Sequence, residues 1–184
     1  KPLMSPYIIS SRIKKNLDNN EKVVLIVMDC LRSDHMKAIH SQLASLFHIN
    51  INYYLSILPT ATPYSRNAIF SGYFPNKLQD EYSSIWEKMW QDEKSMNRYE
   101  GQFLKDQMNR LGYNSKSVHY HKVISYAEGN KLENRINEFK EVDFLALVIN
   151  FVDILGHSRS ESNILQEMIP DESAYRKAVC SWLE

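Results

Sequence analysis

The sequence has few cysteines, no excess of charge of either sign and no long hydrophobic run. Its two cysteines, Cys30 and Cys180, are too few for a disulfide scaffold, and Cys30 follows an apolar run, where a reduced thiol is the ordinary state. The 22 basic and 22 acidic residues cancel, so bulk charge does not draw the chain to nucleic acid or to an anionic membrane. We therefore expect a reducing, cytoplasmic setting.

No segment of the sequence is suited to crossing a membrane. The longest apolar stretches, Val23 to Met28 and Phe144 to Ile149, fall far short of the roughly 18 residues that a spanning helix needs, and no signal-type segment opens the chain. The 184 residues, 43% hydrophobic and 24% charged, suit one globular domain rather than a disordered chain. The chain starts at Lys1 and stops at Glu184, directly after a helix-like stretch, which indicates an excised fragment.

The first third of the chain alternates helix and strand patterns. Apolar residues recur every four positions at Ile9, Ile13 and Leu17, which predicts an amphipathic N-terminal helix within residues 1–20. The β-branched run Val23 to Met28 then predicts a strand buried on both faces of a parallel sheet. A helix packed on that sheet is expected from Arg32 to Phe47, with apolar Met36, Ile39, Leu43, Leu46 and Phe47.

The rest of the chain continues this alternation. Ile49 to Leu58 alternates as a second strand does, and a helix follows at Ser65 to Phe70, closed by Gly72. Residues 80–110 predict packing helices, with a substrate-side insertion as the alternative. The remaining expected elements are a strand at 117–123, a helix at Lys131 to Phe139, a strand at Asp143 to Val152 and a helix at Glu172 to Leu183.

This alternation predicts an α/β fold, with a three-layer, mostly parallel sheet and helices on both faces. Functional residues of such sheets gather at the carboxyl ends of the strands. The rule selects Asp29 after the first strand, the loop Pro59 to Arg66 after the second, and Asp153 with His157 after the last. We divide the chain into the N-terminal helix, residues 1–20, and a domain over residues 21–184.

These residue types suit a divalent metal ion of the zinc type. Carboxylate oxygen and imidazole nitrogen are good zinc ligands, and a metal can activate the hydroxyl of Thr62 as a nucleophile near neutral pH. Each residue also has an ordinary structural explanation. Asp29 suits a helix N-cap, Thr60 to Pro63 a turn, and Asp153 with His157 a local pair.

The loop resembles the alkaline phosphatase superfamily in its spacing. Arg66 is four residues after Thr62, and Gly72 is ten residues after it. The sulfatases of that superfamily have Cys-x-Pro-x-Arg, whereas Thr62 to Arg66 has a threonine and an earlier proline. The loop is more similar to the Pro-Thr-x-Thr loop of nucleotide pyrophosphatases and phosphodiesterases, which makes Thr62 the nucleophile and Thr60 a supporting residue. A sulfatase or mutase function is correspondingly disfavoured.

Two further segments share this resemblance. Asp29-Cys30-Leu31-Arg32 is similar to the superfamily's Asp-x-x-Arg opening, and Asp153-Ile154-Leu155-Gly156-His157 is similar to its Asp-x-x-Gly-His metal segment. Arg32 is interpreted as a structural ion-pair residue, and zinc ligation by Cys30 is the less favoured reading of that thiol. The resemblance implies two zinc ions in a complete domain, with Asp29, Thr62, Asp153 and His157 as ligands and Arg66 or Asn67 orienting the phosphate oxygens.

More closely, Leu58 to Thr62, Ser65 to Phe70 and Asn150 to Asp153 look like the PglZ domain, and most like the effector domain of PorX-type response regulators of type IX secretion. The resemblance implies a receiver domain before this chain and a fold that is incomplete at the C-terminus. It implies a zinc-dependent phosphodiesterase for nucleotides or oligonucleotides in the complete chain, and an inactive fragment. Its implied partners are a sigma factor, a sensor kinase, secretion-motor proteins and a second copy in a homodimer. A non-catalytic interaction module on the same fold is the alternative.

Two other features have a possible binding role and a favoured structural one. His119 and His121 share one face of the strand at 117–123, a spacing that can bind zinc, although surface or packing histidines are the favoured interpretation. Tyr, Trp and Met residues within 82–108 can stack the bases of an oligonucleotide, against the favoured core or partner-facing role.

Overall fold

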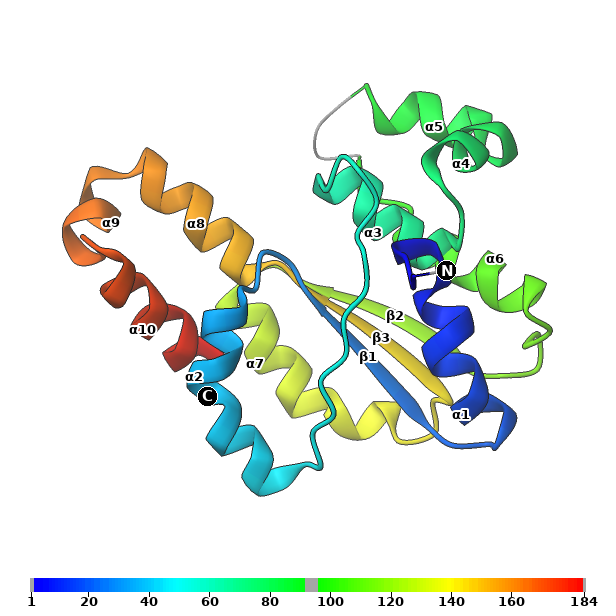
Figure 1. Ribbon diagram of the computed structural model, residues 1–184, viewed down its shortest axis with the longest axis horizontal. Coiled ribbons are helices and arrows are strands. Elements are labelled where there is room, and N and C mark those ends of the chain that lie inside the picture. Colours follow the sequence, from blue (N-terminus) through cyan, green and yellow to red (C-terminus); the bar gives the residue numbers. More distant parts are fainter. Residues whose placement is uncertain (1, 92–95, 184) are drawn as a thin grey trace. The chain divides into compact units, whose positions relative to one another are not determined.

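The computed structural model describes residues 2–91 and 96–183 and has the predicted α/β class (Figure 1). Three parallel strands form one sheet in the order β1-β3-β2. Their bounds are Val23–Met28 for β1, Val118–Val123 for β2 and Phe144–Ile149 for β3. Strand β3 lies between β1 and β2, so the strands that follow each other in the sequence, β1 and β2, are not adjacent in the sheet. The connections between the parallel strands are crossovers that contain helices.

Helices make up most of the rest of the described chain. In the first half they are η1 Ser5–Tyr7, η2 Ile9–Ile13, α1 Lys14–Asp18, α2 Ser33–Leu46, α3 Thr62–Ser71, α4 Pro75–Glu81 and α5 Ser83–Met89. In the second half they are α6 Glu100–Arg110, α7 Tyr126–Arg135, η4 Ile136–Phe139, α8 Phe151–Glu161, α9 Asn163–Met168 and α10 Glu172–Leu183. The expected helix at Glu172 to Leu183 is confirmed.

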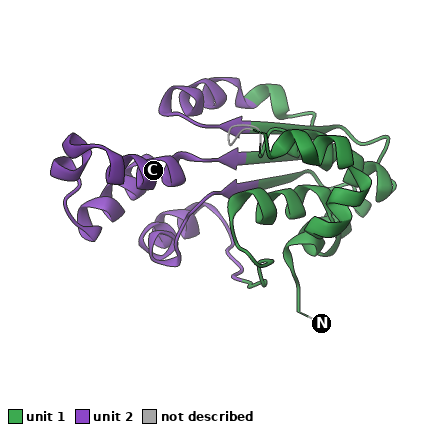
Figure 2. Cartoon of the chain, turned by 90° about the horizontal axis from the view of Figure 1, so that it is seen from above, with its two compact units in different colours: residues 1–25, 52–121, 137–147 green, residues 26–51, 122–136, 148–184 purple. Residues whose placement is uncertain are grey.

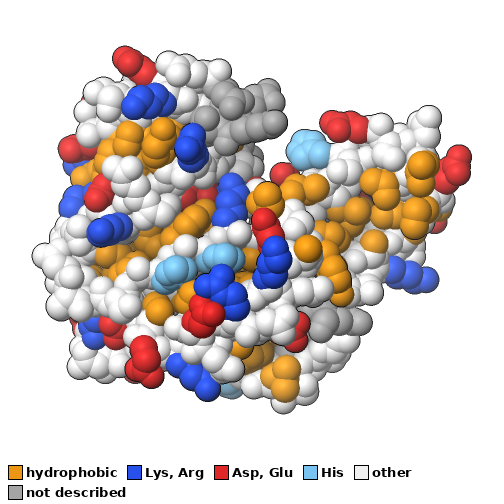
Figure 3. Space-filling model, turned by 180° about the vertical axis from the view of Figure 1, so that it is seen from behind, with side chains coloured by type: hydrophobic (Ala, Val, Ile, Leu, Met, Phe, Trp, Pro, Cys, Tyr) orange, Lys and Arg blue, Asp and Glu red, His pale blue; other side chains and the backbone are white. Residues whose placement is uncertain are grey.

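The chain divides into two compact units, coloured separately in Figure 2. The first unit contains residues 1–25, 52–121 and 137–147, and the second contains residues 26–51, 122–136 and 148–184. Each strand of the sheet contributes residues to both units. On the face of the molecule shown in Figure 3, basic, acidic and hydrophobic side chains are interspersed, in keeping with the balanced composition.

The N-terminal helix of the first unit buries the predicted stripe. Ile9, Ile13 and Leu17 are at most 6% exposed, as their spacing indicates. The segment is not a plain α-helix, because Ile9–Ile13 is a π-helix followed by one α turn. The wider π turn offsets the drift that α geometry gives to residues spaced by four, so the three side chains stay in line.

Helix α3 is at the centre of the first unit, where it packs against α6 and η1. Its residues from Arg66 to Ser71 are all buried, and Gly72 ends the helix in the left-handed conformation with φ of 69°. The packing interpretation of residues 80–110 is confirmed for four apolar side chains but not for Trp90, which is 37% exposed, and residues 92–95 lie outside the described residues. Met89, Phe103, Leu104 and Met108 are at most 1% exposed.

Strand β3 is buried and β1 is not, which corrects one expectation. Phe144 to Val148 are all buried, as the apolar run predicts. Val24 and Ile26 of β1, however, are 57% and 52% exposed, so β1 is not buried on both faces. Val24 and Ile26 alternate along the strand and so share one face of the sheet, and that face is open to solvent at this edge strand.

The second expected strand, Ile49 to Leu58, does not form. Among the described residues its strand pairing is limited to an isolated parallel bridge between Leu55 and Met4. The segment is therefore a loop, although its apolar pattern suits a strand. The end of α2 is also less packed than predicted, because Leu46 and Phe47 are 76% and 65% exposed.

The second unit has its own small core. Val152, Ile169, Tyr175 and Val179 are buried together, and helix α10 packs against α2 while α8 packs against α9. None of the described helices is both long and apolar enough to span a bilayer.

Candidate active site

Thr62 is the first residue of helix α3. The preceding loop contains a cis peptide bond between Leu58 and Pro59, and Thr60 is exposed. Tyr64 and Ser65 donate their backbone N–H groups to the carbonyl of Ala61 at 3.0 Å, which starts the helix. Pro63 suits the first turn of the helix, because a backbone N–H at this position would have no hydrogen-bond partner within the helix. Thr62 is half-buried at a helix N-terminus, which is electrostatically favourable to anions.

Arg66, one helical turn after Thr62, is buried in a bidentate ion pair. Its Nε donates to Oε1 of Glu100 at 2.8 Å and its Nη2 donates to Oε2 at 2.6 Å. The exposed fractions of the two side chains are 3% and 0%. Sequence reasoning missed Glu100, because nothing in the sequence pairs Arg66 with a glutamate 34 positions later.

Two neutral side chains complete the hydrogen bonding of Glu100. Asn97 donates to Oε1 at 2.9 Å and also to the carbonyl oxygen of Thr62 at 3.4 Å. Tyr120 donates its hydroxyl to Oε2 at 2.6 Å. Burial, and then the nearby Glu100 carboxylate, raise the pKa of Tyr120, so this hydroxyl remains a donor. The network fixes the backbone of Thr62 to α6.

Asn67 is fully buried, and its amide is used within the fold. Its Nδ2 donates to the carbonyl oxygens of Pro63 at 2.7 Å and Met96 at 2.9 Å. Its Oδ1 has no hydrogen-bond partner among the described residues. Both amide hydrogens therefore bond to carbonyl groups, so Asn67 holds the first turn of α3. The role of Arg66 and Asn67 toward phosphate oxygens stays a prediction.

The second unit contains the other candidate residues. Asp29 follows β1 and donates its backbone N–H to Ile149 at 3.0 Å. Asp153 and His157 lie one turn apart on α8, with 3.5 Å between Oδ1 and Nε2. Cys30 donates its thiol to the same Oδ1 at 3.0 Å. Helix spacing thus brings Asp153 and His157 together, as their sequence separation predicts.

The backbone at Cys30 is in the left-handed region, with φ of 58°. That conformation favours glycine over a residue with a side chain. The thiol is nonetheless used, because it contacts the carboxylate of Asp153.

The candidate residues therefore form two groups in different units. Thr62, Arg66 and Asn67 belong to the first unit, and Asp29, Asp153 and His157 belong to the second (Figure 2). The oxygen and nitrogen donors of the second group suit zinc chemically. Among the described residues, however, no group of three or more His, Cys, Asp or Glu side chains is arranged to hold a metal ion. The described residues do not by themselves form a complete metal site.

An ion-pair network lies beside Asp29 in the sequence. Arg32 bonds to Asp34 through Nη2 at 2.8 Å and to Glu172 through Nη1 at 2.6 Å, and Arg176 bonds to Asp34 at 3.1 Å. Arg32 thus has the structural pairing that we expected. The hydrogen bond from Arg32 lowers the pKa of Asp34 to about 2. The network links the start of α2 to α10.

His35 is a further residue that sequence reasoning missed. It is fully buried, its Nδ1 accepts a hydrogen bond from the backbone N–H of Arg32 at 3.3 Å, and its ring packs on Tyr175. Nε2 has no hydrogen-bond partner among the described residues. Desolvation lowers the pKa of His35. The only sequence signal for burial is its spacing of four from Ile39.

Aromatic side chains form a cluster in the first unit. The ring centroids of Tyr64 and Trp90 are 5.2 Å apart, and those of Trp90 and Trp86 are 5.5 Å apart. Trp90 is 37% exposed. An indole with this exposure can still accept another flat ring.

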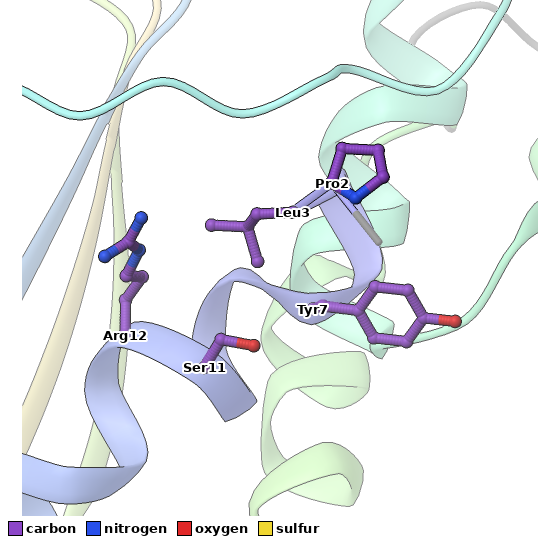
Figure 4. Close-up of a pocket in the computed structure, with 5 residues that line it drawn as sticks. All are labelled: Pro2, Leu3, Tyr7, Ser11 and Arg12. Carbon is purple, nitrogen blue, oxygen red and sulfur yellow. The ribbon is translucent and has the colours of Figure 1, made fainter.

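The pocket in Figure 4, also in the first unit, contains none of the candidate residues. It has a volume of about 360 Å³ and is lined by Pro2, Leu3, Tyr7, Ser11 and Arg12. The side chain of Leu3 lies between those of Arg12 and Tyr7, and the Tyr7 ring points away from Arg12 (Figure 4).

Comparison with known families now decides the relationship. The chain matches the family model described as the BREX system PglZ alkaline phosphatase-like domain over residues 8–181. The chain belongs to the PglZ family. The expected PglZ resemblance is confirmed, and the domain has a hydrolase-type fold of a superfamily that is generally metal-dependent. A search of the curated proteins finds no match.

Proposed function

We propose that this PglZ domain hydrolyses phosphate esters and that the hydroxyl of Thr62 is the nucleophile. The observation that carries the proposal is the place of Thr62 at the N-terminus of α3, in a chain whose family is alkaline phosphatase-like. The dipole of the helix favours a phosphate group at this end. The network of Arg66, Glu100 and Asn97 holds the Thr62 backbone in place.

The proposed reaction has two displacements at phosphorus. The oxygen of Thr62 bonds to phosphorus, the bond to the leaving oxygen breaks, and the hydroxyl proton ends on that leaving oxygen. Water then displaces Thr62 from phosphorus and restores the hydroxyl group. We assign Arg66 and Asn67 to positioning, because both are bonded within the fold around the first turn of α3.

Zinc is the proposed metal. A bound zinc ion supplies positive charge and lowers the pKa of a coordinated hydroxyl or water. The support in this chain is the donor pair Asp153 and His157, with Asp29 and Thr62 proposed as further ligands. Among the described residues, no three of these potential ligands are arranged around a metal position.

Nucleotides or oligonucleotides are the proposed substrates. The supporting feature is the cluster of Tyr64, Trp86 and Trp90, whose first member is two residues after Thr62. Base stacking on an aromatic side chain contributes about 1–3 kcal/mol per base. Trp90→Ala should therefore raise KM for a dinucleotide and leave KM for a small alkyl phosphodiester unchanged.

The deciding experiment measures zinc-dependent hydrolysis of bis(p-nitrophenyl) phosphate by the full-length protein. Thr62→Ala should abolish turnover while circular dichroism shows an unchanged fold, and Thr62→Ser should retain part of the activity. Ser41→Ala, which removes an exposed hydroxyl group from α2, is the control and should retain most of the activity. Zinc-dependent turnover that survives in Thr62→Ala would overturn the assignment.

A finer role rests on the resemblance to PorX-type response regulators. We propose on that basis a cytoplasmic effector domain that acts in type IX secretion with a sensor kinase, a sigma factor, secretion-motor proteins and a second copy of itself. The cytoplasmic location is supported by two cysteines that form no disulfide. Loss of secretion in a strain that carries Thr62→Ala would connect the enzyme to that role.

A non-catalytic interaction module is the second candidate. The observation that favours it is the exposed apolar loop after α2, where Phe47, Ile51 and Tyr53 are 65%, 65% and 87% exposed. Exposed apolar side chains in one segment are typical of a partner-binding surface. This candidate predicts that Thr62→Ala leaves partner binding and secretion unchanged, whereas Tyr53→Ser reduces both.

A further inference from the structure

The edge strand β2 presents two histidines on one side and a packed tyrosine on the other. Tyr120 packs edge-on against Phe70 of α3 with centroids 5.5 Å apart and bonds to Glu100 of α6. Because side chains alternate along a strand, His119 and His121 share the opposite face. That face is therefore not the one that α3 and α6 cover.

The two imidazole rings lie side by side. Their centroids are 6.4 Å apart and their planes differ by 19°. Phe139 of η4 contacts both, with centroid distances of 4.9 Å to His119 and 6.4 Å to His121. His119 is exposed and His121 is half-buried, so solvent reaches the pair. Packing on Phe139 aligns the rings and does not cover them.

We propose that His119 and His121 form a binding site for one divalent transition-metal ion of the copper, nickel or zinc type, with water in the remaining positions. Imidazole is the common protein ligand of these metals. Magnesium and calcium prefer oxygen ligands and are excluded by the donor set. The site uses none of the residues of the proposed phosphoester chemistry, so it stands or falls independently of that function.

The geometry needs only a small side-chain change. With a metal–nitrogen bond of about 2.1 Å, a ring centroid lies about 3.2 Å from the ion, so two imidazoles have centroids about 5 Å apart at the tetrahedral angle of zinc and about 4.5 Å apart at the right angle of a tetragonal Cu²⁺ site. The observed 6.4 Å must close by roughly 1 to 2 Å, and the rings must tilt from their near-parallel arrangement. Rotation about the side-chain bonds of the exposed His119 provides this movement without a change in the strand.

The number of protein ligands determines whether a metal site is open or closed. Among the described residues no group of three or more potential ligands is arranged around a metal position, so the site is open rather than a closed structural zinc centre. Its affinity should follow the order of transition-metal stability, with Cu²⁺ bound more tightly than Ni²⁺ or Zn²⁺.

The test titrates Cu²⁺, Ni²⁺, Zn²⁺ and Mg²⁺ into the 184-residue chain by calorimetry and counts coordinated nitrogens on Cu²⁺ by electron paramagnetic resonance. An Asp153→Asn/His157→Ala background removes the other donor pair. We expect one bound Cu²⁺ with two imidazole nitrogens, no Mg²⁺ binding, and at least a tenfold loss of Cu²⁺ affinity in His119→Ala or His121→Ala.

His40→Ala, on an exposed histidine of α2, is the matched control and should bind Cu²⁺ unchanged. The nitrogen count on the background protein does not depend on the folding of any histidine variant of β2. A count of one nitrogen or none, or affinities that neither β2 variant changes, would overturn the proposal.

Discussion

Arg66 and Glu100 are joined by two hydrogen bonds, of 2.8 and 2.6 Å, in the interior of the first unit, and both side chains are almost completely buried. The pair connects α3, which begins at Thr62, to the first residue of α6. A buried ion pair is costly to break because the remaining charge has no solvent. This relationship therefore links the stability of the fold to the position of the candidate nucleophile.

Glu100→Ala should destabilise the protein by about 3–5 kcal/mol, because it leaves the Arg66 guanidinium buried without its carboxylate. The free energy of unfolding from urea denaturation measures the loss. The control is Glu87→Ala, on an exposed glutamate of α5, which should leave stability nearly unchanged. Replacing both partners, in Arg66→Met/Glu100→Leu, should cost less than Glu100→Ala alone. Equal losses of unfolding free energy in Glu87→Ala and Glu100→Ala would contradict the prediction that the buried Arg66–Glu100 pair is costly to break.

Gly72→Ala should cost more than Gly112→Ala. Both glycines have positive φ, 69° and 90°, so each substitution carries backbone strain of about 1–2 kcal/mol. A Cβ at Gly72 would also overlap the amide of Gln107, whereas a Cβ at Gly112 meets nothing within 4 Å. Gln107 is almost fully buried and cannot move into solvent easily. The difference between the melting temperatures of the two variants measures the cost of the overlap with Gln107. Equal melting temperatures would contradict the prediction.

Stability should fall as the pH is lowered through the range near 6.5 because of His35. Desolvation lowers its pKa in the folded state, although Asp34 and Glu172 oppose this while Arg32 and Arg176 support it. A depressed histidine pKa gives stability that is complete above the unfolded value of about 6.5 and is lost as the pH falls toward the folded pKa. Protonation also places a hydrogen on Nδ1. In the neutral ring this atom accepts a hydrogen bond from the backbone N–H of Arg32, and protonation removes that bond.

Urea denaturation between pH 5 and 7.5 measures this slope. His35→Gln should flatten it, whereas His40→Gln, on exposed α2 surface, should keep it. The lowered pKa values of Asp34 and Glu172, both caused first by the hydrogen bond from Arg32, also remove stability as the pH falls. Their effect belongs to the range below about pH 4.5, so it does not overlap the histidine range. An unchanged slope in His35→Gln would refute the assignment.

Zinc binding by the second unit should depend on Asp153 and His157 and not on Cys30. The thiol donates to Asp153 Oδ1, so Cys30→Ala leaves this oxygen available to a metal. We expect a loss of zinc affinity of at least tenfold in Asp153→Asn and in His157→Ala, and an unchanged or higher affinity in Cys30→Ala. Calorimetry in a His119→Ala/His121→Ala background gives the comparison. A large loss in Cys30→Ala would make the thiol a zinc ligand instead.

Local patterns predicted the elements whose signals lie within a few residues. The apolar run Val23–Met28 is a strand with the expected bounds, and Gly72 ends α3 because only glycine adopts positive φ without strain. Asp153 and His157 meet because a spacing of four residues places them on one helical face. The prediction of a second strand at Ile49 to Leu58 was wrong, because a segment with an alternating pattern forms a strand only if a neighbouring strand pairs with it.

The sequence by itself determined the α/β class, a helix over Ser65 to Phe70 and the PglZ motifs, since periodicity and short spacings are local properties. The structure starts that helix three residues earlier, at Thr62. Only the tertiary structure decided which polar groups are buried and paired. Glu100 is 34 positions from Arg66, and Tyr120 is 20 positions from Glu100, yet they form one hydrogen-bonded network. Such partners are selected by the packing of α3, α6 and β2, because desolvation demands a partner for a buried charge and chain geometry supplies it.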